Sequence, residues 1–176
     1  DRVSKGWDGL CRRVCSWGYF QRKSDKTRFY FLSTHLDHRG AVAKMEGSKL
    51  IVKFMKEKCK GENAIVVGDF NVVQDSEPYN VFAKCGFLND TYEAAKYRFA
   101  PNGTFSGFNP YSFTSRRIDH IFVSKQFSVH RYGILTPFYW SKDDKENKYI
   151  VRHVSDHFPI SATLELPRLR APQDWA

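Results

Sequence analysis

Apolar residues with two different spacings divide the first half of the chain into predicted strands and a helix. Residues 28–34 (RFYFLST) are rich in aromatic and β-branched side chains and predict a strand. Over residues 41–58 the apolar positions recur every three or four residues among Lys and Glu, which predicts a helix that ends before Gly61. A second strand is predicted over residues 64–67. The order strand, helix, strand indicates an α/β protein.

The second half of the chain mixes predicted strands with long connections. The stretch from Ser76 to Pro78 predicts the start of a helix that ends before Gly86. Residues 98–115 combine turn-forming Gly and Pro with aromatic residues, so we expect a long loop of the kind that is often functional. Residues 141–148 (SKDDKENK) are expected to form a solvated polar loop. Three further strands are predicted, over residues 117–124, 127–136 and 158–165.

Length and composition fit one soluble globular domain. The chain has 176 residues, of which 41% are hydrophobic and 27% are charged. No apolar stretch approaches the roughly 20 residues that a membrane-spanning helix needs. The four cysteines, Cys11, Cys15, Cys59 and Cys85, lack the paired spacing of a zinc site, and we interpret them as buried or incidental thiols.

Positive charge is concentrated near the start of the chain. The whole sequence has 28 Lys and Arg against 19 Asp and Glu, and residues 1–30 hold eight basic and three acidic side chains. Such a field attracts a polyanion such as nucleic acid, or a phosphorylated ligand. A solvated surface carries similar charges, so the charge alone does not identify a partner.

Four segments share one pattern, in which polar side chains adjoin an apolar strand. Strand ends in an α/β sheet are where ligands tend to bind, so we expect the four segments to meet in one cleft. Phosphoester hydrolysis needs an activated water and stabilisation of the phosphoryl oxygens, and carboxylates, imidazoles and amides suit these tasks. The segments are THLDH at 34–38, GDFN at 68–71, RIDH at 117–120 and SDH at 155–157.

Spacing and chemistry assign a role to several of these residues. Asp69 and Asn71 are two residues apart, so their side chains point to the same side of an extended backbone. Asp69 can accept a proton from water while Asn71 donates to a phosphate oxygen. Asp119 can accept a hydrogen bond from His157 and thereby raise the basicity of the imidazole. This leaves Asp156 as a hard oxygen ligand for Mg²⁺.

The ordered motifs THL at 34–36, GDFN at 68–71, RID at 117–119 and SDHFP at 155–159 resemble the endonuclease/exonuclease/phosphatase family, the DNase I-like metal-dependent phosphoesterases. The resemblance covers nearly the whole chain. It implies an α/β (α+β) fold, part of a four-layer α/β/β/α sandwich with two mixed β-sheets. It also implies a phosphoester hydrolase that uses Mg²⁺ or Mn²⁺ and binds a phosphate-containing substrate.

Carried over to this chain, the resemblance adds His35 as a contact to the scissile phosphate. It gives His157 the task of stabilising the phosphoryl oxygens in the transition state, and it places Asp156 on or next to the metal. Asp37, His38 and His120 are expected behind the site or on the surface. The implied catalytic residues are His35, Asp69, Asn71, Asp119 and His157, with His35 and Asn71 binding substrate and Asp156 binding metal.

The chain departs from the family at its start. Family members carry an Asn and a metal-binding Glu before the THL strand, and none of Asp1, Asp8 and Asp25 has the strand-end setting to replace that Glu. We therefore expect residues 1–176 to be one domain, the C-terminal part of an endonuclease/exonuclease/phosphatase domain. We also expect weak metal binding and an apolar face that packs on the missing N-terminal half or on another copy.

Three functions stay open at this point. The first is a nuclease or other phosphodiesterase acting on nucleic acid, favoured by the basic opening and by aromatic residues that can stack on bases, namely Phe105, Phe108, Tyr111 and Phe113. The second is a phosphatase or phosphodiesterase acting on a small molecule or a lipid headgroup. The third is an inactive fragment that binds phosphate.

Overall fold

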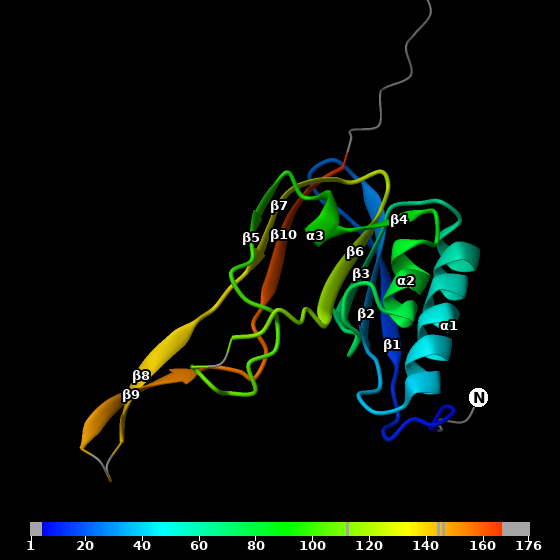
Figure 1. Cartoon of the computed structure of the whole chain (residues 1–176). Coiled ribbons are helices and arrows are strands. Elements are labelled where there is room, and N and C mark those ends of the chain that lie inside the picture. Colours follow the sequence, from blue (N-terminus) through cyan, green and yellow to red (C-terminus); the bar gives the residue numbers. More distant parts are fainter. Residues whose placement is uncertain (1–4, 112, 144, 146, 167–176) are drawn as a thin grey trace, which may run out of the picture.

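Two mixed β-sheets form the centre of the protein (Figure 1). The computed structural model describes residues 5–111, 113–143, 145 and 147–166. The larger sheet contains, in spatial order, β1 (Cys15–Gln21), β2 (Arg28–His35), β3 (Ala64–Asp69), β6 (Asp119–Ser124) and β4 (Leu88–Asp90). The smaller sheet contains β10 (Ile160–Glu165), β7 (Ser128–Ile134) and β5 (Tyr97–Phe99). Each sheet has one parallel pair, β2 with β3 and β5 with β7.

The helices and the smaller sheet cover opposite faces of the larger sheet (Figure 1). Helices α1 (Ala41–Cys59) and α2 (Glu77–Ala83) pack on one face, and the short helix α3 (Thr91–Ala94) follows β4. This α/β/β arrangement with two mixed sheets confirms the predicted fold class. None of the described helices is long and apolar enough to cross a membrane.

A third, two-stranded sheet corrects one prediction. β8 (Phe138–Asp143) and β9 (Lys148–His153) pair as an antiparallel hairpin that projects from the body (Figure 1). The predicted polar loop over residues 141–148 is therefore wrong at its two ends, and residues 144 and 146 lie outside the described residues. The pairing continues through the polar residues, with Lys142 opposite Tyr149 and Asp143 opposite Lys148.

The other differences concern short or solvent-exposed elements. Residues 98 and 99, predicted as loop, belong to β5 because they pair with β7. Sequence patterns missed β1, β4, α3 and β5. Three of these have only three or four residues, too few to show a period. On β1, Trp17, Tyr19 and Phe20 remain 42–50% exposed, and the expectation that a missing half or another copy covers them stays a prediction.

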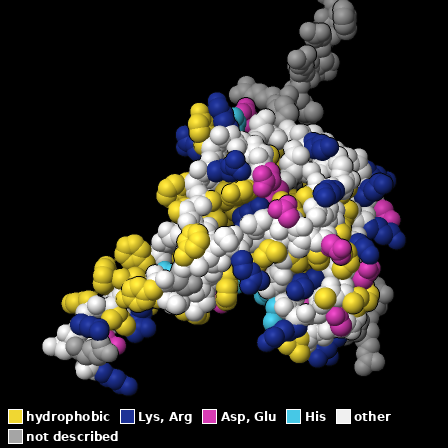
Figure 2. Space-filling model, in the orientation of Figure 1, with side chains coloured by type: hydrophobic (Ala, Val, Ile, Leu, Met, Phe, Trp, Pro, Cys, Tyr) yellow, Lys and Arg dark blue, Asp and Glu magenta, His cyan; other side chains and the backbone are white. Residues whose placement is uncertain are grey.

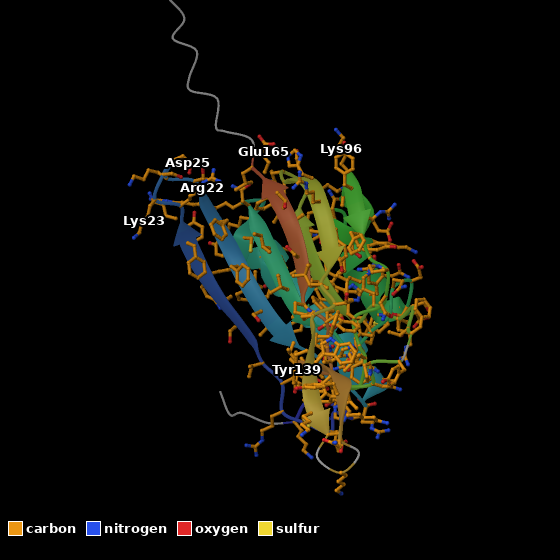
Figure 3. All side chains as sticks on the ribbon, turned by 90° about the vertical axis from the view of Figure 1, so that its left-hand side faces the viewer. Arg22, Lys23, Asp25, Lys96, Tyr139 and Glu165 are labelled. Atoms are coloured by element: carbon orange, nitrogen blue, oxygen red, sulfur yellow. The ribbon has the colours of Figure 1, made fainter. Side chains whose placement is uncertain are left out.

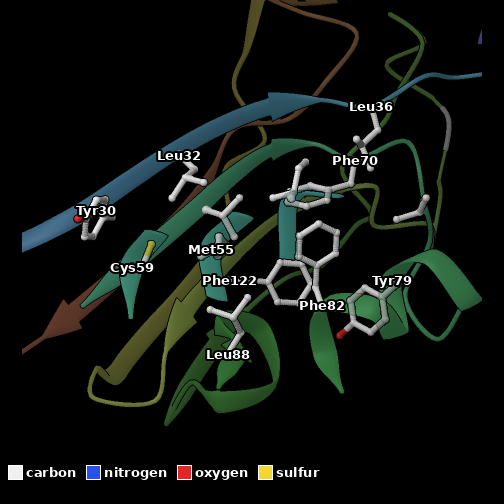
Figure 4. Packing of buried hydrophobic residues seen from close by; sticks show 14 residues of the cluster. Tyr30, Leu32, Leu36, Met55, Cys59, Phe70, Tyr79, Phe82, Leu88 and Phe122 are labelled. Carbon is white, nitrogen blue, oxygen red and sulfur yellow. The ribbon is translucent and has the colours of Figure 1, made fainter. Parts of the chain in front are cut away.

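The core between the helices and the larger sheet is built around three fully buried phenylalanines (Figure 4). The ring centroids of Phe70 and Phe82 are 4.9 Å apart, and those of Phe82 and Phe122 are 5.2 Å apart. Phe70 is the aromatic residue of the GDFN segment. Its burial fixes the backbone on either side of it, where Asp69 and Asn71 stand.

A buried polar network lies beside this core. Arg117 donates to Asp90 at 2.8 Å, and the Tyr79 hydroxyl donates to the same carboxylate oxygen at 2.7 Å. Arg117 also donates to Nδ1 of His120 at 2.8 Å, because a guanidinium can only donate. Nε2 of His120 therefore carries the proton and donates to the Val72 carbonyl at 2.8 Å. Burial and the nearby Arg117 charge lower the pKa of His120 to about 4, so the buried imidazole is neutral at pH 7.

Gly68 allows β2 and β3 to approach each other at their ends. Its φ of +149° and its pairing with Thr34 leave no room for a side chain, since a Cβ would stand 1.8 Å from the Thr34 carbonyl oxygen. Neither backbone can move away without breaking the ladder of the parallel pair. Glycine is therefore required at this position.

We expect Gly68→Ala to lower the free energy of unfolding by about 3 kcal/mol or more, because the new methyl group overlaps the backbone of β2. The control is Gly61→Ala, where φ is +83° and no atom lies within 4 Å of the added Cβ. It tests backbone strain alone and should cost about 1 kcal/mol. Urea unfolding measures both losses, and equal losses would contradict the overlap.

The neutral state of His120 predicts a pH-dependent loss of stability. The unfolded chain takes up a proton on His120 near pH 6.5 and the folded chain only near pH 4, so the unfolded state binds more protons in this window. Stability therefore falls as the pH drops from 6.5 to 4, by up to about 3 kcal/mol.

His120→Gln should flatten this part of the pH dependence, since it removes the titrating group. His38→Gln, at an exposed histidine, should keep the slope of the parent protein. Urea midpoints at pH 7 and pH 4.5 measure both. The assignment is wrong if His120→Gln loses as much stability between these pH values as the parent protein does.

Candidate active site

Three predicted site residues lie side by side across the larger sheet. In the strand register, His35 at the end of β2 pairs with Asp69 at the end of β3, and Asp69 pairs with Asp119 at the start of β6. His157 reaches this row from the segment between β9 and β10. The four polar segments therefore meet at one edge of the sheet.

The side chains of these residues form a connected cluster. Oδ2 of Asp69 lies 3.1 Å from Nε2 of His35 and 3.8 Å from Nε2 of His157. Nδ1 of His157 lies 2.9 Å from Oδ2 of Asp119. The His35 side chain is 55% exposed, whereas Asp69 and Asp119 are only 15% and 16% exposed. The cluster is thus open to a ligand on its histidine side and held by protein on its carboxylate side.

Electrostatics of the cluster favour a protonated His157. Burial alone would lower the pKa of His157, but the hydrogen bond to Asp119 and the charges of Asp119, Asp69 and Asp156 outweigh burial and raise it. Burial raises the pKa of Asp119, and hydrogen bonds from Thr104 and His157 counteract this only in part. With Nδ1–H directed to Asp119, the Nε2–H of the imidazolium faces Asp69 and the open side of the site.

Asn71 orients Asp69. Its backbone N–H donates to Oδ1 of Asp69 at 2.8 Å, which its left-handed φ of +51° permits. Its side-chain amide donates to Oδ2 of Asp69 at 3.2 Å and to the Leu36 carbonyl at 3.0 Å. Both amide hydrogens therefore have acceptors within the protein, and donation from Asn71 to a phosphate stays a prediction.

Thr104 joins the two segments that carry the Asp119–His157 pair. Its buried hydroxyl accepts hydrogen bonds from the backbone N–H groups of Ile118 at 2.9 Å and Asp119 at 3.1 Å. Its carbonyl accepts from the N–H of Phe158 at 2.8 Å. Sequence reasoning missed Thr104, because a threonine in a loop carries no local signal of such a role.

Asp156 lies next to the cluster, where its charge acts on His157. Its carboxylate receives a long hydrogen bond of 3.4 Å from the Ser155 hydroxyl. Among the described residues, Asp69, Asp119 and His157 offer ligand atoms within 4.8 Å of one another. The carboxylates of Asp69 and Asp119, beside the weakly bonded carboxylate of Asp156, are oxygen donors that fit a hard divalent cation.

The neighbouring polar residues have structural roles. The buried Asp37 accepts from the backbone N–H groups of Cys11 at 2.9 Å and Gly40 at 2.7 Å, and so closes the loop after β2. His38 is exposed beside Arg13. Asp8 accepts from the N–H groups of Val42 and Ala43 and caps the start of α1. The four cysteines are free, and only Cys59 is buried.

Comparisons with known proteins agree with this arrangement. Residues 6–157 match the Endonuclease/Exonuclease/phosphatase family. A comparison with curated proteins gives no match.

Solved structures of bacterial proteins are similar along almost the whole chain. A family member from Bacteroides thetaiotaomicron is 47% identical with a TM-score of 0.88, over 92% of this chain and 59% of its own length. A mannosyl-6-phosphatase from the same organism is 47% identical with a TM-score of 0.87, over 93% of this chain and 61% of its own length. A Bacteroides vulgatus family member is 31% identical with a TM-score of 0.78, over 93% of this chain and 59% of its own length.

This chain thus spans about three fifths of the length of these relatives. The family match covers most of the sequence, and the matched region contains the motifs whose side chains meet at the sheet edge. The chain belongs to the endonuclease/exonuclease/phosphatase family.

Proposed function

We propose that this chain supplies catalytic residues of a metal-dependent phosphoesterase that hydrolyses the phosphate ester of a sugar phosphate. The observation that carries the proposal is the convergence of His35 and His157 on one carboxylate oxygen of Asp69, with Asp119 behind His157. The 47% identity to a mannosyl-6-phosphatase supports a phosphorylated sugar as the substrate.

The residues divide the chemistry of hydrolysis between them. Asp69 is held by Asn71 so that Oδ2 faces the open side of the site, where it orients an attacking water or accepts its proton. His35, the most exposed member of the cluster, contacts the phosphate. His157, protonated and anchored by Asp119, donates its Nε2–H to a phosphoryl oxygen as negative charge grows there.

The proposed cofactor is Mg²⁺ or Mn²⁺. Asp156 is assigned to hold it next to the cluster, because the Ser155 hydroxyl is the one hydrogen-bond donor to its carboxylate among the described residues. When bound, such an ion supplies positive charge to the phosphoryl oxygens and lowers the pKa of a bound water.

A second candidate is hydrolysis of nucleic acid. The formal net charge of +9 favours a polyanionic substrate. This alternative stays a prediction, and the substrate assay below separates it from the first.

The assay compares mannose 6-phosphate, phosphorylated inositols, plasmid DNA and RNA as substrates of the full-length protein with Mg²⁺ or Mn²⁺. We expect release of phosphate from the sugar ester. Cleavage of DNA or RNA without turnover of any sugar phosphate would overturn the sugar phosphatase and favour the nuclease.

Asp69→Asn is expected to lower kcat at least about 100-fold, because the amide keeps the shape of the side chain but cannot accept the proton. The matched control is Asp25→Asn. The Asp25 carboxylate pairs with Arg22 in the turn before β2, at the opposite end of that strand from His35 and at the end of the molecule opposite Tyr139 (Figure 3). This control variant should keep the activity of the parent protein. Full activity in Asp69→Asn would contradict the proposed site.

Thr104→Val should lower both stability and activity. Valine matches threonine in shape but leaves two backbone N–H groups without their acceptor, which costs about 1–3 kcal/mol. Asp119 then holds His157 less firmly, the pKa of His157 falls, and the alkaline limb of the kcat profile moves to lower pH. Thr104→Ser keeps the acceptor and should restore the profile. An unchanged pH profile in Thr104→Val would show that Thr104 does not position the pair.

A further inference from the structure

The loop before the RID segment has an unusual composition. Residues 100–115, here named the aromatic loop, contain no Asp, Glu, Lys, Arg or His, although 27% of the whole chain is charged. Aromatic rings alternate in this loop with small hydroxyl and amide side chains (APNGTFSGFNPYSFTS). Such a surface suits a ligand that is neutral, has apolar faces and offers many hydroxyl groups.

The aromatic loop is tied together at its ends. The N–H groups of Gly103 and Thr114 both donate to Oδ1 of Asn102, at 2.9 Å and 2.8 Å. The N–H of Gly103 also donates to the Thr114 carbonyl. These bonds close a compact loop of the Ω type and hold its aromatic residues on one short piece of chain.

The same loop is attached to the catalytic segment. The N–H groups of Ser106 and Gly107 donate to the Asp156 carbonyl at 2.7 Å and 3.1 Å. The ring of Phe105 packs edge-on against the imidazole of His157, with centroids 5.1 Å apart. The aromatic loop is therefore a side wall of the phosphate site, and a group attached to a bound phosphate can extend along it.

The aromatic side chains of the aromatic loop are exposed to solvent. Phe105 is 43% exposed, Phe108 59%, Tyr111 84% and Phe113 76%. The β8–β9 hairpin also carries exposed rings, such as Trp140. Figure 2 shows hydrophobic side chains gathered on this projecting part of the molecule, with Lys and Arg towards its tip and over the body.

We propose that the aromatic loop binds neutral sugar residues that adjoin the phosphorylated one, so that the substrate is a phosphorylated oligosaccharide. This inference rests on the proposed sugar phosphatase. The C–H face of a pyranose stacks on Phe108 and Phe113, and its hydroxyls bond to the Asn109 and Tyr111 side chains between them. A nucleic acid would require cations along its backbone, which the aromatic loop lacks. An anionic lipid surface would require them as well.

The first test compares two substrates of the full-length protein, a mannose oligosaccharide with a terminal 6-phosphate and glycerol phosphate. Phe108→Ala and Phe113→Ala should each lower kcat/KM about tenfold more for the oligosaccharide than for glycerol phosphate, the loss expected for one stacked ring. Phe108→Trp keeps a stacking surface and should retain the ratio of the parent protein.

The matched control is Tyr97→Ala. Tyr97 is 61% exposed on β5, next to Lys96, which lies at the end of the molecule opposite Tyr139 (Figure 3). This variant should match the parent protein with both substrates. Ratios that are equal in the parent protein, Phe108→Ala and Phe113→Ala overturn the inference and leave the proposed phosphatase intact.

The second test needs no catalysis. NMR titration of the full-length protein with the unphosphorylated mannose oligosaccharide should show binding that Phe108→Ala weakens and Tyr97→Ala does not. If this binding occurs while no phosphate ester is turned over, the proposed function fails, but the binding of neutral sugar residues by the aromatic loop stands. Absence of glycan binding by the parent protein overturns the inference. Stronger binding of single-stranded DNA or anionic phosphatidylserine vesicles through Phe108 also overturns it.

Discussion

The close approach of two backbones at Gly68 is the constraint on which the site depends. β2 and β3 are parallel neighbours, and their pairing continues to the last residue of each strand only because Gly68 has no side chain to separate it from Thr34. This pairing places His35 against Asp69, and the antiparallel pairing of β3 with β6 places Asp69 against Asp119. A shift of one residue in either pair would send these side chains to opposite faces of the sheet.

Buried residues support the row formed by His35, Asp69 and Asp119. Phe70 fills the core directly after Asp69, and the buried network of Arg117, Asp90 and His120 fixes the backbone on either side of Asp119. Thr104 then connects Asp119 to the segment that carries His157. The site residues therefore lie on packed and hydrogen-bonded backbone, which preserves the geometry that the proposed hydrolysis requires.

Charge is distributed unevenly around the site. Carboxylates surround His157 and raise its pKa, and their surplus of negative charge favours a divalent cation. The adjoining aromatic loop carries no charge at all. A charged centre beside the neutral aromatic loop fits a substrate with one phosphate and an uncharged remainder. This links the proposed sugar phosphatase with the proposed binding of sugar residues by the aromatic loop.

The sequence by itself determined the long elements and singled out the polar residues that the fold brings together. Residues 28–34, 41–58 and 64–67 have lengths and apolar spacings that local backbone preferences fix, and the observed β2, α1 and β3 agree with them. The polar ends of the strands marked His35, Asp69 and Asp119. Their meeting with His157 followed from the rule that strand ends in such sheets form ligand sites.

Only the tertiary structure decided which groups support these residues. Thr104 and Phe105 act through partners more than 10 residues away in sequence, and no local pattern encodes such contacts. The strands β4 and β5 are too short for a period, and they form because neighbouring strands supply their hydrogen bonds. The hairpin β8–β9 extends into a charged segment for the same reason, since cross-strand pairing prevails there over local polarity.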